Sequence, residues 1–542
     1  MPISTIATTP FDDQKPGTAG LRKKVTVIQQ AHYLENFLQA IFNSVPELAG
    51  GTLVIGGDGR FHNAHAIKTA IAMAAANGVA QVIVGRDGLL STPAASNLIR
   101  QRGATGGMIF TASHNPAGPD GDFGIKYNIN NGGQASESIT NNIHKASQEI
   151  REYRIVEEAQ IDLRQDQQQL EGMAIAMVDP VSAYADLMEQ LFDFQQIRAW
   201  LQQGRRICFD AMHAVTGPYA TEILVRRLGA PEDSVINAIP LEDFGGGHPD
   251  PNLVYAKELV ARMFADGAPD FAAASDGDGD RNMILGPGIF ISPGDSLAML
   301  ADHLAELPGY RKGLAGLARS MPTSRAVDAV AAAKKLPCYE TPTGWKFFAN
   351  LLEVSRLTLC GEESFGTSSD HTREKDGLWA ALAWINVLAH TGNSVPALAR
   401  SHWQRYGRHY YQRHDYEDLP ADQARTVMRT LTQRLATLPG QAYGDWTVSA
   451  ADDFSYVDPV DGSTASGQGL RVVFGEQARI VMRLSGTGTG GATLRLYLER
   501  YEANNDKLDW RPEVALAPLA QVAEELSGLQ ATTGRQGPSL VT

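Results

Sequence analysis

Cysteine is scarce in this chain of 542 residues, which contains only Cys208, Cys338 and Cys360. An odd and widely spaced set of three argues against a disulfide framework and against a cysteine-based zinc site. A reducing compartment is the simplest expectation, and we predict a cytoplasmic protein.

Long apolar runs and an export signal are also missing. No window approaches the roughly 20 apolar residues that a membrane span requires. The most apolar stretch, 377–388, has the length of a buried helix. The first residues show no basic segment followed by an apolar one, so no secretory signal is predicted.

An excess of basic residues is absent as well. The chain has 47 Lys and Arg against 61 Asp and Glu, a formal net charge of −14. Nucleic acids and anionic membranes attract clustered basic residues, so neither is expected as a partner. A phosphorylated small molecule remains compatible, because it needs only a local basic pocket. The oligomeric state is not determined by the sequence.

What the chain does have is enough apolar residues, 43%, for several buried cores. Its length predicts three to four domains. Strand-like and helix-like segments alternate through the first three quarters, which predicts mixed or parallel sheets covered by helices. The segments are strands at 52–56, 81–85, 107–110, 206–210, 270–275 and 356–360, and helices at 64–76, 218–228, 295–307 and 326–335.

The last quarter, from about residue 408, has a different pattern. Alternating residues at 469–474, 479–484 and 493–497 predict an antiparallel sheet. A helix is expected at 519–526, with Pro518 in its first turn. The final nine residues are expected to form a loose tail.

In the first block a loop reading TASHNP follows the strand at 107–110. The Asn-Pro step predicts a turn, which leaves Ser113 at an exposed strand end. A serine nucleophile needs a base or positive surroundings, and His114 and Lys126 are close in the sequence. The loop is not the Gly-x-Ser-x-Gly elbow of hydrolases. Taken alone, the Ser-His pair is better explained as a hydrogen-bonded turn.

In the second block a loop reads DGDGDR, in which Asp276, Asp278 and Asp280 alternate with glycine. Glycine lets the loop curl until the three carboxylates face one point. Such anions repel unless a cation lies between them, and oxygen ligands with open positions suit Mg²⁺. An EF-hand is rejected because Arg281 and Pro287 stand where that loop requires Gly and Glu. A solvated acidic turn is the simpler alternative, but a guanidinium beside the ligands favours phosphate binding.

In the third block a loop reads GEESFG, and segments 341–346 and 371–376 are close to it in the sequence. Its carboxylate and hydroxyl groups suit sugar hydroxyls, although a surface turn has the same composition. Lys375 is a candidate proton-transfer group or phosphate clamp. A solvated charged face is the alternative for that lysine.

In the fourth block a glycine-rich loop occupies 483–491. Its backbone N–H and hydroxyl groups can surround an anion. It lacks the Gly-Lys-Ser/Thr ending of a nucleotide P-loop, so ATP is not implied. A glycine-rich β-turn is the alternative, and the flanking Arg483 and Arg495 favour phosphate.

In combination, TASHNP, DGDGDR, GEESFG and RLSGTGTGGATLR resemble the α-D-phosphohexomutase superfamily, most closely its phosphoglucomutase branch. Matching stretches, including DFGGGHPDPN, TPTGWKFF and REKDGLWA, run from about Lys15 to Arg495. The resemblance implies an α/β protein with four domains around a central cleft: three similar mixed-sheet α/β domains, then an α+β domain with an antiparallel sheet. We expect these domains at 1–190, 191–294, 295–407 and 408–542.

The resemblance also implies a reaction, the reversible interconversion of glucose 1-phosphate and glucose 6-phosphate. Ser113 would be phosphorylated, and glucose 1,6-bisphosphate would be the intermediate. Mg²⁺ would be held by Ser113, Asp276, Asp278 and Asp280. The implied catalytic residues are Ser113, Arg22, His114, Lys126 and Lys375. The implied substrate-binding residues are Arg281, Thr343, Gly344, Glu362, Ser364, Lys375, Arg483, Ser485, Gly486, Thr487, Thr489 and Arg495.

Two departures from the family pattern concern small residues. Ala19 stands where the family usually has Ser, and 489–491 reads Thr-Gly-Gly where Ser and Ala are common. Both bear on substrate positioning more than on the reaction. The alternatives are a mutase that also accepts mannose phosphates, a phosphatase, and a non-catalytic sugar-phosphate sensor. GEESFG favours glucose, and the intact Ser113 and aspartates argue against the sensor.

Overall fold

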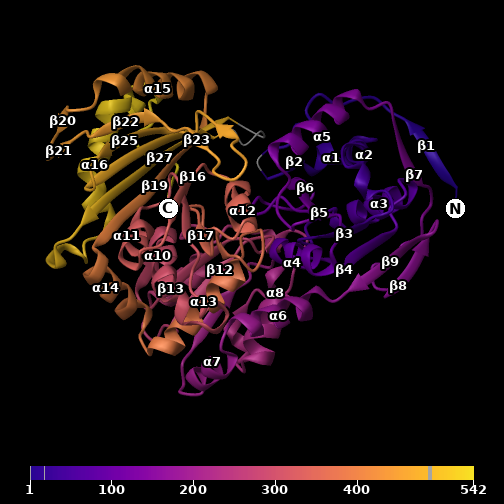
Figure 1. The fold of residues 1–542 in the computed structure, drawn as a ribbon, viewed down its shortest axis with the longest axis horizontal. Coiled ribbons are helices and arrows are strands. Elements are labelled where there is room, and N and C mark those ends of the chain that lie inside the picture. Colours follow the sequence, from indigo (N-terminus) through magenta and orange to yellow (C-terminus); the bar gives the residue numbers. More distant parts are fainter. Residues whose placement is uncertain (1, 18, 486–490) are drawn as a thin grey trace.

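The computed structural model describes residues 2–17, 19–485 and 491–542, which form four successive units. In Figure 1 the first and last units are two lobes, with the two middle units between them. The predicted class is confirmed: three units have a mixed sheet with helices, and the fourth has an antiparallel sheet.

The first unit contains a seven-stranded sheet. Its strands are β2 (Leu21–Lys24), β3 (Thr52–Gly57), β4 (Gln81–Leu89), β5 (Gly106–Phe110), β6 (Asp122–Ile129), β8 (Gln167–Leu170) and β9 (Met173–Val178). Its helices are α1 (Val25–Ile28), α2 (Tyr33–Ser44), α3 (Asn63–Ala76), α4 (Thr92–Arg102) and α5 (Glu137–Glu149). The strand order is β2-β6-β5-β3-β4-β9-β8. A separate antiparallel pair consists of β1 (Ile3–Ala7) and β7 (Glu152–Val156).

This sheet separates two apolar clusters, because neighbouring residues of a strand point to opposite faces. Met108 and Phe110 pack with α2 and α3 on one face. Ile109 packs with α4 on the other face, in a cluster that continues into the second and third units. The bounds of α4 follow from local sequence: Ser91 caps its first turn, and Gly103, with φ 58°, ends it.

The second unit has a five-stranded sheet, and the third has a four-stranded sheet. The second contains β10 (Ile207–Asp210), β11 (Val235–Ile236), β12 (Phe271–Ser275), β13 (Asn282–Gly286), β14 (Ile289–Ile291), α6 (Pro180–Leu191), α7 (Phe194–Leu201), α8 (Thr216–Ala220), the π-helical η2 (Thr221–Arg227) and α9 (Lys257–Met263). The third contains β15 (Leu317–Ser320), β16 (Cys338–Thr341), β17 (Leu359–Gly361), β18 (Thr367–Ser369), α10 (Pro293–His303), α11 (Ala326–Lys334), α12 (Trp345–Glu353), α13 (Gly377–Thr391) and α14 (Val395–Tyr406).

One strand pattern recurs in the first three units. A central strand pairs in parallel with a strand on each side, and one of those flanking strands pairs antiparallel with the strand that follows it. The orders are β4-β3-β5-β6, β11-β10-β12-β13 and β16-β15-β17-β18. TASHNP, DGDGDR and GEESFG each follow the third strand of this pattern. The three loops therefore occupy equivalent positions, at the carboxyl ends of parallel strands, where ligands bind in α/β sheets.

The fourth unit has a six-stranded antiparallel sheet with the order β22-β25-β26-β27-β19-β28. Its helices pack against one face of this sheet. Its elements are β19 (Arg408–Leu419), β20 (Ala442–Tyr443), β21 (Trp446–Thr447), β22 (Ala450–Asp453), β23 (Tyr456–Val457), β24 (Thr464–Ala465), β25 (Leu470–Phe474), β26 (Ala478–Ser485), β27 (Ala492–Glu502), β28 (Leu540–Val541), α15 (Ala421–Arg434), α16 (Pro512–Ser527) and α17 (Leu529–Thr533).

Two predictions near the C-terminus are wrong. The last long helix begins at Pro512 rather than at residue 519, so Pro518 lies inside it. Buried apolar residues recur from Ala515 to Leu526, and their packing outweighs the interruption by one proline. The tail is not loose either: Leu540–Val541 forms an edge strand on β19, because strand edges offer unpaired N–H and C=O groups.

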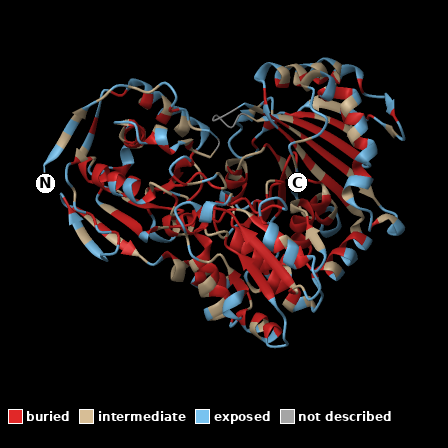
Figure 2. Ribbon diagram, turned by 180° about the vertical axis from the view of Figure 1, so that it is seen from behind, coloured by how far each residue is buried: buried red, intermediate tan, exposed pale blue. Residues whose placement is uncertain are grey.

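Buried residues are concentrated in the sheets and in the helices between the units (Figure 2). The largest apolar cluster joins the first three units, whereas the fourth has a cluster of its own. The predicted buried helix at 377–388 is confirmed as α13. Within the described part of the chain, no helix combines the length and apolarity needed to cross a membrane.

Candidate active site

Ser113 lies just beyond the end of β5 in a conformation that few L-residues adopt. Its φ is 54°, in the left-handed region. Two contacts hold it there: the Ser113 N–H donates to Thr111 Oγ1 at 2.8 Å, and Arg60 Nη2 donates to the Ser113 carbonyl at 2.7 Å. Arg60 is itself fixed by Asp58, and both side chains are fully buried. Such strain persists only where the surroundings impose it, and it is common at functional sites.

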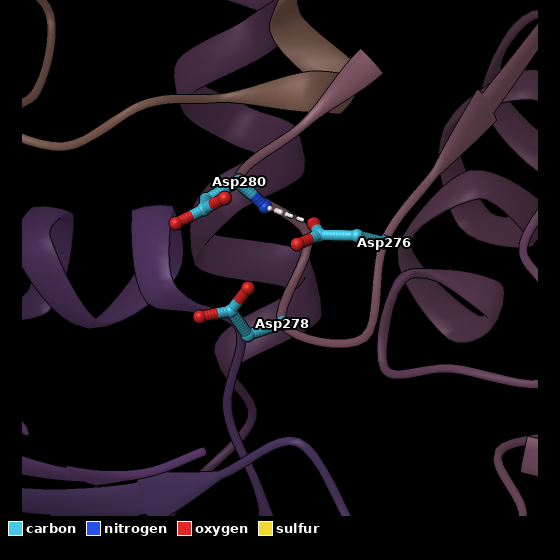
Figure 3. A group of neighbouring side chains, drawn as sticks. All are labelled: Asp276, Asp278 and Asp280. Carbon is cyan, nitrogen blue, oxygen red and sulfur yellow. Dashed lines mark hydrogen bonds between the residues drawn. The ribbon is translucent and has the colours of Figure 1, made fainter. Parts of the chain in front are cut away.

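The loop after β12 brings its three carboxylates together as predicted. Asp276, Asp278 and Asp280 are buried, and one oxygen from each lies within 4.8 Å of the others. Figure 3 shows the three carboxylates turned toward a common point. The Asp280 and Arg281 N–H groups donate to Asp276 Oδ1 at 2.9 and 3.0 Å, which closes the turn.

The first and second loops meet directly. Ser113 Oγ donates to Asp276 Oδ2 at 2.8 Å, and His114 Nδ1 lies 3.3 Å from the same hydroxyl. A Cβ at Gly277 would lie 2.4 Å from the Ser113 carbonyl, so this approach requires glycine. A candidate nucleophile therefore lies beside the candidate metal ligands.

The aspartate group has the properties of a divalent-cation site. Oδ1 of Asp278 and Oδ1 of Asp280 are buried and accept no hydrogen bond from the residues that the structure describes, although the Lys375 ammonium lies near Asp280 Oδ1. Burial, together with the negative charges of Asp280 and Asp278, raises the pKa of Asp276 well above its usual range. Burial would also raise the pKa of Asp278, but the Lys126 ammonium holds it below the ordinary value. These oxygen donors fit a hard cation such as Mg²⁺.

Basic side chains surround the aspartates. Lys126 Nζ lies 2.7 Å from Asp278 Oδ2 and 3.6 Å from Asp280 Oδ2, and Lys375 Nζ lies 3.2 Å from Asp280 Oδ1. Burial alone would lower the pKa of Lys126, but the two aspartates raise it above its ordinary value.

Arg22 and Arg281 complete this cationic group, and the imidazole of His114 lies beside them. Burial lowers the pKa of Arg22, and the charges of Asp278 and Asp280 oppose the change. Burial, followed by the charges of Arg281 and Arg22, lowers the pKa of His114 well below its usual value. The site therefore combines a hydroxyl group, a set of metal ligands and positive charge. These are the groups that phosphoryl transfer requires.

The third loop packs against the second. Arg281 forms a β-bridge with Gly366, and the Asn282 N–H donates to the Phe365 carbonyl at 2.8 Å. Glu362 then faces segment 341–346: its carboxylate accepts from the Gly344 N–H at 3.1 Å and from Ser364 Oγ at 3.3 Å.

Two polar groups of the third unit remain available to a ligand. Thr343 Oγ1 is buried without a hydrogen-bond partner in the described part of the chain. Burial raises the pKa of Glu362, and the charge of Lys375 opposes the rise. Hydroxyl and carboxyl groups of this kind suit sugar hydroxyls.

In the fourth unit, Arg483 of β26 lies opposite Arg495 of β27. Directly opposed residues of antiparallel strands point to the same face, so the two guanidinium groups are neighbours. Ser485 ends β26 and is partly buried. The predicted phosphate-loop residues Gly486, Thr487 and Thr489 lie outside the described residues.

Sequence reasoning missed two buried charges that connect the third and fourth units. Glu363 accepts from Ser320 Oγ at 2.8 Å and from Tyr497 OH at 3.3 Å. Burial would raise its pKa, but Arg483 and Arg413 hold it below the ordinary value. Arg413 is buried and pairs with Asp415 at 2.9 Å. For Arg413 the available signal was the run of charges in segment 408–419, whereas Glu363 lies in the GEESFG loop.

Comparisons with known proteins cover the whole chain. Three phosphoglucomutase/phosphomannomutase models, for alpha/beta/alpha domains I, II and III, match residues 13–154, 182–288 and 293–406, and the model for the phosphoglucomutase-1 C-terminal domain of vertebrates and fungi matches 408–539.

Several individual proteins are similar to this chain over its whole length. A phosphoglucomutase of Rhizobium radiobacter is 55% identical over 541 residues, and phosphoglucomutase-1 of Homo sapiens is 50% identical over 560 residues; each alignment covers 100% of both chains. The open form of pp63/parafusin, a phosphoglucomutase from Paramecium, superimposes with a TM-score of 0.92 at 43% identity, covering 100% of this chain and 99% of that one.

Proposed function

The chain belongs to the phosphoglucomutase/phosphomannomutase family, and we propose that its four loops interconvert glucose 1-phosphate and glucose 6-phosphate. It is an enzyme of the mutase class. The observation that most directly supports the proposal is the 2.8 Å hydrogen bond from Ser113 Oγ to Asp276 Oδ2, which joins a nucleophile to a carboxylate triad.

In the proposed reaction, phosphorylated Ser113 gives its phosphoryl group to the free hydroxyl of the sugar monophosphate. The P–O bond to serine breaks as a bond to the sugar oxygen forms, the sugar hydroxyl loses its proton and Ser113 Oγ gains one, which yields glucose 1,6-bisphosphate. The bisphosphate turns round and returns its other phosphoryl group to Ser113. The isomeric monophosphate is then released, and the phosphorylated enzyme is restored.

Catalysis in this scheme depends on position and charge. Arg22, His114, Lys126 and Lys375 surround the phosphoryl group, and the three cations Arg22, Lys126 and Lys375 offset its negative charge. Bound Mg²⁺, with Asp276, Asp278, Asp280 and a phosphoserine oxygen as ligands, would supply further charge neutralisation and polarise the phosphoryl group.

The substrate is assigned to the remaining loops. Glu362, Ser364, Thr343 and Gly344 bind sugar hydroxyls. The phosphate that does not react is bound by Arg483, Ser485, Gly486, Thr487, Thr489 and Arg495. Arg281, beside the metal ligands, binds phosphate oxygens. With domain limits at 1–190, 191–294, 295–407 and 408–542, each domain provides one loop.

The test measures conversion of glucose 1-phosphate by wild type and Ser113→Ala, with Mg²⁺ and a trace of glucose 1,6-bisphosphate. Strong activity on glucose 1-phosphate, weak activity on mannose 1-phosphate and loss in the variant are expected. Ser138→Ala, an exposed serine of α5, is the matched control. An inactive wild type would refute the substrate, and full activity in Ser113→Ala would refute the mechanism.

A further inference from the structure

Glu374 is a fully buried carboxyl group that the proposed reaction does not use. It lies in the segment between β18 and α13, immediately before Lys375. Its Oε1 accepts from Asn128 Nδ2 at 2.9 Å, and its Oε2 accepts from Gln134 Nε2 at 3.1 Å. Both donors belong to the first unit, whereas Glu374 belongs to the third. The carboxyl group therefore bridges two units.

On the first-unit side, the bridge connects to Lys126. Asn128 follows Lys126 by two residues on β6, so the two side chains leave the same face of the strand. Asn128 is completely buried, and its Nδ2 also donates to the Gly132 carbonyl at 3.0 Å. The strand segment that holds Lys126 against Asp278 is thus the segment that Glu374 contacts.

On the third-unit side, Glu374 is adjacent in sequence to Lys375. The segment that contains both residues is closed at its base by His371, whose ring nitrogens contact Ser369 Oγ at 2.8 Å and Asp376 Oδ2 at 2.9 Å. Asp376 also caps α13 by accepting from the Trp379 N–H at 3.0 Å. Glu374 and Lys375 therefore project from a segment whose base is fixed. Within the described residues, Glu374 provides its hydrogen bond to β6, and the Arg373 N–H donates to Ser96 Oγ of α4 at 3.0 Å.

We propose that Glu374 is a positioning residue, which sets the place of Lys375 relative to Lys126 by joining its segment to β6. Lys126 contacts Asp278 and Asp280 from the first unit, and Lys375 contacts Asp280 from the third. Their separation therefore depends on how the units are joined, and the Glu374 bridge is the direct polar link between the two lysine-bearing segments. This inference rests on the proposed function, because its kinetic consequence requires phosphoryl transfer at Ser113.

The kinetic consequence follows from geometry. A displacement of the order of 1 Å at a charged group can cost about a hundredfold in rate, because charge stabilisation and alignment both suffer. The hydrogen bonds of Glu374 involve none of the sugar-binding groups on GEESFG. Loss of the bridge should therefore lower kcat and leave KM nearly unchanged.

The experiment compares Glu374→Gln, Gln134→Leu and the double variant at pH 8, with hydrogen exchange of segment 370–377 as a second measurement. Glu374→Gln keeps the shape of the side chain but replaces one acceptor by a donor. We expect kcat to fall about tenfold or more, KM for glucose 1-phosphate to change less than about twofold, and exchange to accelerate. In the double variant, Gln134→Leu should lower kcat little further than Glu374→Gln alone, because both substitutions remove hydrogen bonds of the same bridge.

Glu353→Gln is the matched control. Glu353 pairs with Arg373 of the same segment at 2.7 Å but is partly exposed and has no contact with β6. It should behave like wild type. The proposal is overturned if Glu374→Gln keeps kcat, if it loses kcat without faster exchange, or if Glu353→Gln loses kcat equally. If wild type itself does not convert glucose 1-phosphate, the proposed function fails, and the exchange data alone decide whether Glu374 orders the segment.

Discussion

At the residue scale, the candidate active site combines buried negative and positive side chains that come from more than one loop. Asp278 uses Oδ2 for Lys126 and for Thr92 Oγ1, which lie 2.7 and 2.8 Å away, while its Oδ1 has no hydrogen-bond partner among the described residues. Asp280 Oδ1 lies 3.2 Å from Lys375 Nζ. The lysines therefore offset part of the negative charge and leave Asp278 Oδ1 for a cation.

Asp278→Asn should weaken Mg²⁺ binding while the fold stays intact. The amide oxygen can still accept from Thr92, but one negative charge of the ligand set is lost. We expect the Mg²⁺ concentration for half-maximal activity to rise about tenfold or more, as carboxylates are the preferred ligands of this ion. Activity measured against Mg²⁺ concentration tests this.

Asp243→Asn, at an exposed aspartate of the same unit, is the control for this change. Thermal unfolding in EDTA should show similar midpoints for the variant and wild type. Unaltered activity of Asp278→Asn at limiting Mg²⁺ would remove Asp278 from the ligand set.

At the scale of elements, the site depends on strands and helices that are held far from it. Helix α14 is one example, since it packs through Leu398, His402 and Trp403 at the end of the third unit. His402 is buried, and its Nδ1 has no hydrogen-bond partner. Burial lowers the pKa of His402 to about 4, and the Asp302 charge only partly opposes this.

The buried imidazole makes stability depend on pH. Between the ordinary histidine pKa of about 6.5 and the folded value, the unfolded chain binds a proton that the folded chain does not. Stability therefore falls as pH decreases through this window, by up to about 1.4 kcal/mol per pH unit. Urea unfolding at pH 7.5 and pH 5.0 should show that the free energy of unfolding of His402→Gln rises relative to that of wild type at the lower pH.

His390→Gln, at an exposed histidine near the end of α13, is the matched control. If the free energies of unfolding of His402→Gln and wild type differ by the same amount at the two pH values, the lowered pKa of His402 is contradicted.

At the scale of the whole molecule, the fourth unit is joined to the third through buried charge. Glu499 of β27 accepts from the Arg325 N–H at 2.6 Å and from Ser324 Oγ at 3.1 Å. It also pairs with Arg479 at 2.9 Å, and His409 Nδ1 lies 2.9 Å from its Oε1. Burial would raise the pKa of Glu499, but Arg479 and His409 hold it well below its usual range.

Glu499→Gln should loosen the fourth unit, because a buried guanidinium loses its partner at a cost of about 3–5 kcal/mol. We expect calorimetry to resolve a separate, earlier transition for residues 408–542. The contribution of Glu499 is complete above the ordinary glutamate pKa of about 4.3 and is lost as pH falls through the depressed folded value. The difference in transition temperature between Glu499→Gln and wild type should therefore persist at pH 5 and become smaller in stronger acid.

Glu502→Gln, on the same strand but paired only with Arg500 of that strand among the charges described here, is the matched control. A single transition for Glu499→Gln at the wild-type temperature would show that this contact does not hold the units together.

The sequence by itself determined the parts of this protein that depend on near neighbours. Apolar runs, capping residues and glycine spacing are local, so strands such as 52–56, helices such as 64–76 and the three-aspartate turn were predictable. Asp276, Asp278 and Asp280 were identified as candidate residues in the same way, whereas Ser113 became the candidate nucleophile only through the resemblance of the combined motifs to a family.

Only the tertiary structure decided which of these parts meet. The contact between Ser113 and Asp276 joins residues 163 positions apart. The Arg60 support of Ser113, the Glu363 and Arg413 charges and the Glu374 bridge also join distant segments. The edge strand formed by 540–541 likewise needs a partner that lies more than a hundred residues away. The physical reason is the same in each case: burial makes a charge or a backbone group require a partner, and topology alone determines which one is within reach.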